Sequence, residues 1–445
     1  MHSLRSTVLV GAFIFGSHSL GAQQPPDSTA HRQQRTLDSL SAALAATQAR
    51  LDSVVRATRN APSAPPAAPA RAPSAYMNVS FDGLVNAGWS TASDLDRLEV
   101  GDHDPRVHGF TIPNAELFLE GAVDPFFKGF VNIVHKLDAG AETGVELEEM
   151  YFLTTSLPGN LQLKGGQFFV EFGRQNLQHP HAWAFADQQL VIGRMFGPEG
   201  LRSQGARLSW LLPAAFYAEA SLAVLNSAGG TTSSFRSDES AAIHGGVAVE
   251  RAARGGREML YVPRFATSVD LTDSQTILMG VSGAVGPNNS GPDGQTRIVG
   301  ADIYWKWKSS RARQGFPFVS FQAEALARRY EADARTSAAD TLVLLPAETL
   351  KDLGAYGQLS WGIRPLLIAA VRAEAVRDDD SGPSAFTSGE RGARARYSTN
   401  LTWFPTEFSK VRLQYNYDRR NGIGNDHSLW AQFEFLLGAH AAHKF

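Results

Sequence analysis

The chain has no cysteine among its 445 residues. This excludes a disulfide scaffold, a thiolate nucleophile, an iron–sulfur cluster and a Cys-ligated zinc finger. Neither sign of charge is in excess, because 41 Lys and Arg stand against 44 Asp and Glu. Proteins that mainly bind nucleic acid carry a strongly basic face, so we expect no nucleic-acid partner. The longest apolar run in the body of the chain, Leu366–Val371, is far shorter than the ~18 residues of a spanning helix.

The sequence also lacks the short motifs of common enzyme classes. It contains no G-x-S-x-G element, no P-loop and no dinucleotide-binding fingerprint. No serine lies in a recognisable nucleophile setting. We therefore do not expect an enzyme.

Residues 1–22 are typical of a secretory signal peptide. A weakly positive start is followed by a short apolar core, Thr7–Gly16, and then by the small residues Gly21 and Ala22. The alternative is a buried N-terminal helix. Export would place the mature chain in the bacterial cell envelope.

Residues 23–60 contain a heptad pattern. Leu37, Leu44 and Leu51 lie seven residues apart, and Leu40 and Val54 lie three residues after the first and third of them. This is the a/d seam of a coiled coil, and about three heptads are too short to be stable without partner chains. The pattern predicts a periplasmic coiled-coil helix, with a single amphipathic helix as the alternative. Residues 61–75, rich in Pro and Ala, predict an extended linker.

From residue 76 to residue 445, polar and apolar residues alternate. In Thr296–Lys308 one face carries Val299, Ile303, Trp305 and Trp307, and the other carries mostly polar residues. Such length and terminal aromatics are typical of a transmembrane strand. The same alternation occurs in residues 316–327, 394–403 and 411–418.

The connections between these segments have two lengths. Short turns such as Ser156–Asn160 and Thr272–Ser274 alternate with long polar stretches such as Ser227–Ala242 and Glu331–Lys351. This asymmetry is typical of an outer-membrane barrel, whereas a soluble β-sandwich, the alternative, has no reason to show it. We predict an all-β, transmembrane antiparallel β-barrel over residues 76–445. At roughly 20–25 residues per strand it has about 16 strands, and 14 or 18 would also fit.

The last residues predict the strand that closes the barrel. Counting back by twos from Phe445 gives mainly apolar residues, including Leu437, Phe435 and Phe433. A final strand that ends on Phe is common in bacterial outer-membrane proteins. A barrel of about 16 strands is too wide for its side chains to fill and leaves an aqueous lumen.

The chain resembles the porin-like outer-membrane proteins grouped around the phosphate-selective porin O/P family. The resemblance rests on the order of signal, coiled coil, linker and barrel, and on the stretch 145–207 with its Phe172-Gly173-Arg174 element. It implies a homotrimer that admits small anions through a basic constriction.

Charged residues that face water at a narrow point would select the solute. Candidates for the pore lining are the basic residues Lys164, Arg174, Arg194, Arg202, Arg207, Arg394, Arg396 and Arg412 and the acidic residues Glu171 and Asp187. The alternative for each is an ordinary solvated charge.

Two histidine clusters could hold a metal. His179 and His181 flank Pro180. His103 lies between two aspartates, with His108 close by in the sequence. Imidazole nitrogens with nearby carboxylates could ligate zinc. However, neither cluster has the fixed spacing of a helical zinc site, so we expect no cofactor and keep zinc as an alternative. The alternative for the His179 segment is a loop that folds into the lumen and narrows it.

These features predict an outer-membrane porin, a passive diffusion channel for small hydrophilic solutes with a preference for anions. Its partners are membrane lipid, small solutes and two further copies of the chain. Two other functions stay open: a zinc-associated uptake protein and a structural tether of the envelope.

Overall fold

The computed structural model describes residues 77–95, 98–137, 142–237, 246–249, 253–313, 315–337, 340–378 and 391–438. The predicted signal peptide, coiled-coil helix and linker, residues 1–75, lie outside these residues, as does the end of the chain after Gly438. Among the described residues no helix is long and apolar enough to cross a membrane.

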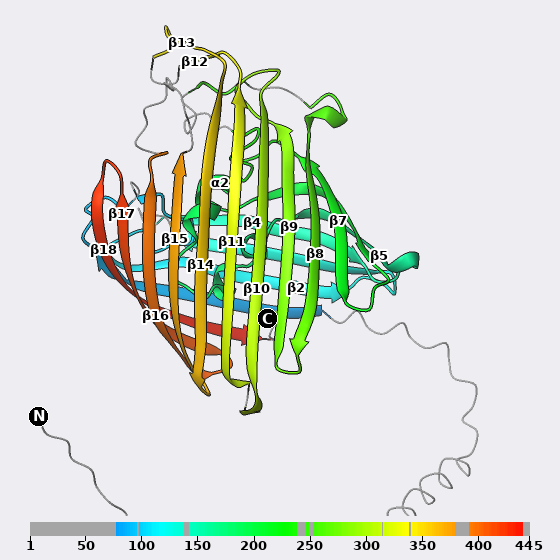
Figure 1. Ribbon diagram of the computed structural model, residues 1–445, viewed down its shortest axis with the longest axis vertical. Helices are drawn as coiled ribbons and strands as arrows, with labels where there is room; N and C mark the ends of the chain where they lie inside the picture. The colour runs from blue at the N-terminus through cyan, green and yellow to red at the C-terminus, as the bar shows by residue number, and fades with distance from the viewer. Residues whose placement is uncertain are drawn as a thin grey trace, which may run out of the picture. The chain divides into compact units, whose positions relative to one another are not determined.

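Sixteen strands form a closed antiparallel barrel (Figure 1). This confirms the predicted all-β barrel and the estimate of about 16 strands. Two further short strands, β12 and β13, form a separate hairpin between β11 and β14. The strands are β1 (Met77–Ser90), β2 (Gly109–Ala122), β3 (Phe127–Leu137), β4 (Thr143–Thr154), β5 (Leu161–Phe169), β6 (Arg202–Leu211), β7 (Tyr217–Asn226), β8 (Met259–Thr272), β9 (Gln275–Pro287), β10 (Gln295–Arg313), β11 (Phe316–Ala332), β12 (Arg335–Thr336), β13 (Leu344–Leu345), β14 (Glu348–Arg364), β15 (Leu367–Asp378), β16 (Arg394–Thr406), β17 (Ser409–Arg420) and β18 (Gly424–Gly438).

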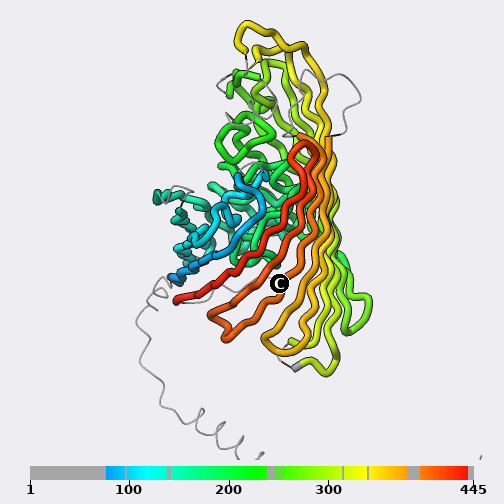
Figure 2. The backbone as a smooth tube through the Cα atoms, turned by 90° about the vertical axis from the view of Figure 1, so that its left-hand side faces the viewer, coloured from blue at the N-terminus to red at the C-terminus, as the bar shows by residue number. Residues whose placement is uncertain are grey.

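The barrel closes where β18 pairs with β1. Ser80 lies opposite Gly438 and Ser90 opposite Ser428, so the first and last strands run side by side (Figure 2). Closure removes the free sheet edges that would otherwise expose unpaired backbone groups. The predicted closing strand extends to Phe445, and its residues beyond Gly438 lie outside the described part of the chain.

The two ends of the barrel differ in their connections. At one end strands are joined by short turns, such as residues 273–274 between β8 and β9 and residues 407–408 between β16 and β17. At the other end lie the longer connections 91–108, 170–201 and 227–258. The difference matches the predicted asymmetry of turns and loops.

The outer face of the wall is apolar. On β10, Val299 is 61% exposed and faces outward, whereas Ile298 and Asp302 on the alternate face are buried. Outward residues from Val299 to Trp307 are all apolar, and nine residues of a tilted strand cover roughly 20–25 Å along the barrel axis. That length matches the apolar band of a membrane barrel.

The inner face is not uniformly polar, which differs from the expectation drawn from the sequence. Apolar side chains point inward from one side of the wall and belong to a single buried cluster. These residues are Ala223 and Leu225 on β7, Leu260 and Val262 on β8, Ala284 on β9, Ile298 on β10, Leu326 on β11 and Val376 on β15. They are buried because a segment of the chain packs against them from within.

Candidate functional site

The connection between β5 and β6, residues 170–201, lies inside the barrel, and we call it the inner segment. It contains two 3-10 turns, η3 (Gln175–Leu177) and η4 (Pro180–Ala182), and the short helix α2 (Leu190–Phe196). α2 lies inside the barrel and packs against β11, β14 and β15 of its wall (Figure 1).

The two ends of the inner segment meet at a narrow neck. Phe169 pairs with Arg202 across β5 and β6. Inside the neck, the Asn176 side-chain amide donates to the carbonyl oxygens of Val170 and Leu201, each at 2.9 Å, and its Oδ1 accepts from Leu201 N at 2.8 Å. One buried asparagine therefore satisfies the backbone groups where the chain leaves and re-enters the sheet.

Apolar packing anchors one side of the inner segment. Phe172, Val191 and Phe196 are each no more than 1% exposed and lie in the cluster with the apolar wall residues. Burying an aliphatic or aromatic side chain contributes about 1.5–3 kcal/mol, so several such residues fix the segment to the wall. The sequence Leu190–Phe196 is apolar almost all round, as expected for a helix that is buried on all sides.

A buried carboxylate holds the segment near its first turn. Glu324 on β11 accepts from the backbone N–H groups of Arg174 and Gln175, at 3.2 and 2.7 Å, and from the Tyr356 hydroxyl at 2.7 Å. Gly173 lies beside it with φ +64°, and a Cβ at this position would come within 2.0 Å of Glu324 Oε2. Glycine is therefore required by both the backbone conformation and the close approach.

Two arginines converge on Asp187 of the inner segment. Arg372 Nη2 and Arg396 Nη1 donate to its carboxylate at 2.5 and 3.0 Å, and Gln414 and Asn416 donate to it at 2.8 Å. Burial alone would raise the pKa of Asp187, but the two guanidinium groups outweigh it and lower this pKa to about 2. The carboxylate is therefore ionised at neutral pH.

Strands β16 and β17 also bind the backbone of the segment. Arg412 Nη2 donates to the Trp183 carbonyl at 2.7 Å, and Asn400 donates to the Ala184 carbonyl at 2.9 Å. Lys410 donates to the His181 carbonyl. These polar residues fix the path of residues 181–187 along this part of the wall.

Acidic residues of β2 and β4 meet the two histidines of the inner segment. His179 Nδ1 lies 2.9 Å from Glu148 and its Nε2 lies 3.0 Å from Glu149, while His181 Nδ1 lies 3.2 Å from Glu116. Burial alone would lower the pKa of His179, but the carboxylates of Glu148 and Glu116 hold it well above its ordinary value. The pKa of His181 is also raised, mainly by Glu116 against the effect of burial.

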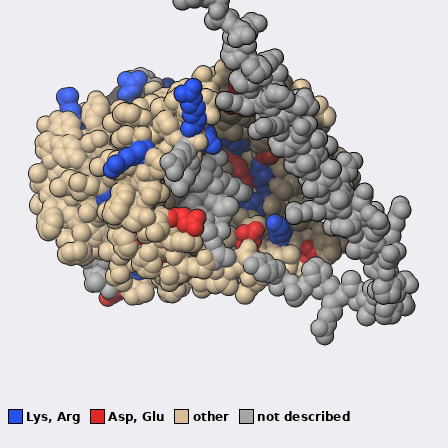
Figure 3. All heavy atoms as spheres, turned by 90° about the horizontal axis from the view of Figure 1, so that it is seen from below, with Lys and Arg blue, Asp and Glu red and all other residues tan. Residues whose placement is uncertain are grey.

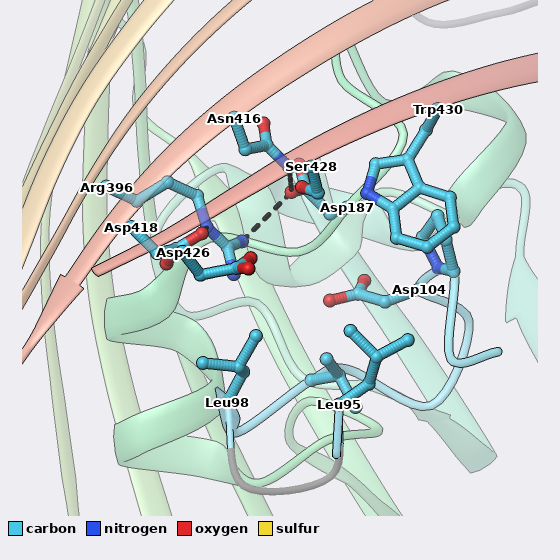
Figure 4. Close-up of a pocket in the computed structure, with 12 residues that line it drawn as sticks. Leu95, Leu98, Asp104, Asp187, Arg396, Asn416, Asp418, Asp426, Ser428 and Trp430 are labelled. Carbon is cyan, nitrogen blue, oxygen red and sulfur yellow. Dashed lines mark hydrogen bonds and ion pairs between the residues drawn. The ribbon is translucent and has the colours of Figure 1, made fainter. Parts of the chain in front are cut away.

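A small pocket lies where the connection 91–108 meets the inner segment (Figure 4). Arg396 reaches from the wall toward Asp187, and Asp104 approaches from the loop side. Asp104 accepts from the backbone N–H groups of Gly101 and Gln188 at 2.8 and 2.7 Å. Burial, together with the charge of Asp187, raises the pKa of Asp104 to about 6.

On the side of the short turns the interior is open. Seen from that end, the barrel is hollowed, and acidic and basic side chains lie in the hollow (Figure 3). We use the name turn-side vestibule for the charged side chains that face inward at this end from β5–β10 and from the inner segment. Its cations are Lys164, Arg174, Arg207, Arg264, Lys306 and Lys308, and its carboxylates are Glu171, Glu219, Asp270 and Asp302.

Three of the residues singled out from the sequence pair with one another in this vestibule. Lys164 Nζ and Arg207 Nε lie 3.2 and 3.4 Å from the Glu171 carboxylate. Arg174 lies apart from them, with its guanidinium 4.0 Å from the centre of the Tyr304 ring on β10.

The other predicted basic residues lie at the inner segment or toward the loops. Arg394 pairs with Asp418 at 2.8 Å, and Arg194 pairs with Glu99 at 3.0 Å. Arg202 lies 3.5 Å from Glu148, close to His179. All three side chains are almost fully buried.

The predicted histidines divide into two groups. His103 Nε2 lies 3.7 Å from Glu148, so His103 and His179 share a carboxylate. His108 lies at the exposed rim, where its Nε2 is 3.0 Å from the Ala92 carbonyl. The structure therefore brings His103, His179 and His181 together and leaves His108 apart.

Sequence reasoning missed several residues that contact the inner segment: Glu116, Asn132, Glu149, Glu324 and Arg372. Four of them alternate with outward apolar neighbours, which places them on the inner face, whereas Glu149 follows the equally buried Glu148 at a bulge in β4. No local signal distinguishes them from other inward residues, because the contact depends on where residues 170–201 fold.

No model of a known protein family matches the chain. The sequence is 31% identical, over 384 residues, to an uncharacterized protein of Aquifex aeolicus, and the match covers 79% of this chain and 76% of that protein. Solved structures of similar fold include an anion-selective porin from Comamonas acidovorans (7% identity, 82% of this chain and 100% of that chain, TM-score 0.49). Another is the outer membrane channel DcaP of Acinetobacter baumannii (13% identity, 81% and 97%, TM-score 0.48).

Proposed function

This chain belongs to the same protein family as an uncharacterized protein of Aquifex aeolicus, and we propose that it forms a diffusion channel for small hydrophilic solutes in the bacterial outer membrane. One observation carries the proposal: a closed barrel with an apolar outer band holds a segment of its own chain inside, fixed by buried charges. A closed barrel satisfies every backbone hydrogen bond of its strands, which the interior of a bilayer demands.

The inner segment sets the narrowest level of the channel. It contacts the wall through apolar packing at β7–β15, through Asp187 at β15–β17 and through His179 at β2–β4. Contacts in three directions leave little room beside the segment. The channel is therefore expected to pass small ions and to exclude larger solutes.

The vestibule supports a preference for anions. Six cations, including Arg174 and Lys306, face four carboxylates there in the described part of the chain. Rings of charged side chains select ions of opposite sign. The finer likeness to the phosphate-selective porin O/P family stays a prediction.

The preference can be measured as a reversal potential across a planar bilayer that separates two KCl concentrations. The wild type should give a potential of the sign that anion flow produces. Arg174→Glu, which reverses a vestibule charge, should shift the potential toward cation flow, whereas Arg297→Glu, on the outer face and 53% exposed, should leave it unchanged. A cation-selective wild type, or equal shifts in both variants, would remove the anion preference.

The heptad in residues 23–60 supports a homotrimer with the coiled coil in the periplasm. Sedimentation of the full chain in detergent would test this. A trimer is expected for the wild type, and a monomer would contradict the proposal.

A further inference from the structure

Four polar side chains from four parts of the chain meet on the inner wall. Glu116 comes from β2, Asn132 from β3, Glu148 from β4 and His179 from the inner segment. The three wall residues are at most 2% exposed, and the His179 side chain is 17% exposed. We call this cluster the His179 site.

One atom from each side chain lies close to the others, and the ligand atoms of Glu116, Glu148 and His179 lie within 4.8 Å of one another. His179 Nδ1 is 2.9 Å from Glu148 Oε2 and 3.6 Å from Glu116 Oε2. Asn132 Nδ2 is 2.7 Å from Glu148 Oε2, 3.3 Å from Glu116 Oε2 and 3.2 Å from His179 Nδ1. Donor atoms around a tetrahedral zinc ion, each about 2.0–2.1 Å from the metal, are about 3.3 Å apart. The spacing of the four atoms therefore fits a metal ion at their centre.

The amide of Asn132 can present oxygen to such an ion. The nitrogen and oxygen of an asparagine amide exchange places when the amide flips by 180°. Asn132 is fully buried, and its Oδ1 has no hydrogen-bond partner among the described residues. Flipped, the amide would offer Oδ1 to the ion as a fourth ligand beside one imidazole nitrogen and two carboxylate oxygens.

The charges around the cluster favour a cation. Glu116, Glu148 and Glu149 are buried close together, and in the described part of the chain Arg202 is the one Lys or Arg within 4 Å of any of them. Arg202 is also shared with Glu146 and Glu199. Buried carboxylates are stable when paired or when they coordinate a metal. A divalent ion bound to neutral His179 would take the place of the proton that these carboxylates otherwise hold on its imidazole ring.

Neighbouring groups hold the ligands in place. Glu149 lies 3.0 Å from His179 Nε2, which keeps Nδ1 directed at the site. Asn114 donates to the other oxygen of Glu116 at 2.6 Å. His181 Nδ1, 3.2 Å from Glu116 Oε2, lies within reach as a further ligand.

We propose that the His179 site binds one divalent transition-metal ion, of which zinc is the natural probe, and that the ion ties the inner segment to β2–β4. Mixed imidazole and carboxylate ligands suit zinc or manganese better than magnesium, which prefers oxygen alone. The ion would fix the narrowest level of the barrel. Binding itself does not depend on the proposed channel function.

Calorimetric titration of the folded full-length protein with zinc chloride in detergent tests the proposal. The wild type should bind one zinc ion per chain at this site. His179→Ala and Glu148→Gln should each weaken binding by about 100-fold or more, since even outer-shell partners of a metal are worth about 10–100-fold. The control His427→Ala, on the exposed outer part of β18, should bind as the wild type does. Circular dichroism checks that each variant folds. If His179→Ala does not fold, Glu148→Gln alone tests the site.

Three results would overturn the proposal: no zinc binding by the wild type, undiminished binding by the folded Glu148→Gln variant, or binding lost only in His103→Ala. The last would place the ion in the neighbouring group of Asp102, His103 and Glu199, whose ligand atoms also lie close together. A chain that binds zinc at the His179 site but conducts no ions would refute the channel and leave the metal site standing.

Discussion

Replacing Asp187 with asparagine should release the inner segment from β15–β17. The substitution keeps the size of the side chain but removes the negative charge that Arg372 and Arg396 share. It also replaces one carboxylate oxygen, a hydrogen-bond acceptor, with an NH2 group that faces the N–H donors of its neighbours. Removing one partner of a buried ion pair costs about 3–5 kcal/mol. Because Arg372 keeps Glu374 at 3.0 Å and Arg396 keeps Asp418 at 3.0 Å, we expect the lower figure, about 3 kcal/mol.

The pKa of Asp187 gives a second route to the magnitude and predicts its pH dependence. A fall from the ordinary 3.8 to about 2 corresponds to about 2 kcal/mol. The pKa is lower in the folded state, so this stability is present above pH 3.8 and is lost as the pH falls toward 2. The difference between wild type and variant should therefore be full at pH 7 and should shrink near pH 2.

Hydrogen–deuterium exchange measures the effect where it arises. The amides of Ala186 and Leu190 donate to Gln414 Oε1 and Glu374 Oε2, each at 2.7 Å. If the closed form loses about 3 kcal/mol of stability relative to the locally open form, amide exchange through that opening should be roughly 150-fold faster at pH 7. Asp340→Asn, in an exposed loop, is the control. Exchange within threefold of the wild type at both amides would refute the reasoning.

Three further predictions concern other parts of the barrel. The pKa of Asp104 is raised to about 6, so the folded protein holds this proton more tightly than the unfolded chain does. The free energy of unfolding, measured by urea titration, should therefore fall as the pH rises from about 4 through 6, and Asp104→Asn should abolish that fall. A flat wild-type profile would contradict this. Asn176→Ala should leave the backbone N–H of Leu201 without its acceptor and remove one of the hydrogen bonds to each neck carbonyl. The expected loss of stability is about 1–3 kcal/mol, measured by urea unfolding in vesicles, and an unchanged midpoint would show that the neck does not need Asn176. Ile303→Arg, in the middle of the outer band on β10, should cost about 2–4 kcal/mol in a bilayer, and no loss in the same assay would mean that this face does not contact lipid.

The barrel was predictable because period-two alternation is a local property of each strand. Residues 394–403 and 411–418 fall within β16 and β17, with the expected faces inward, and the turns and loops fall at opposite ends. Strand number followed from length, because strand and turn lengths in such barrels are limited by the thickness of the membrane.

The interior was only partly predictable, because its contacts join residues far apart in sequence. Ile298 and Leu326 lie on the inner faces of their strands, and nothing near them in the sequence indicates that the inner segment packs in the same cluster. Glu116 and Glu148 lie on either side of β3, and they gain an imidazole partner only because residues 170–201 carry His179 to them. A buried contact between a loop and the barrel wall leaves no periodic pattern in the sequence, so it cannot be predicted in the way that a strand can.

The absence of native cysteine allows a direct test that water and ions pass through this barrel. Ser221 on β7 lies opposite the inward-facing Arg264, whereas the next residue, Leu222, is 44% exposed on the outer face. We predict stepwise single-channel currents in planar bilayers, reduced when a charged, water-soluble thiol reagent modifies Ser221→Cys and unchanged when the same reagent is added to Leu222→Cys. Folded protein that gives no current steps, or steps that respond equally in both variants, would contradict a water-filled path through the barrel.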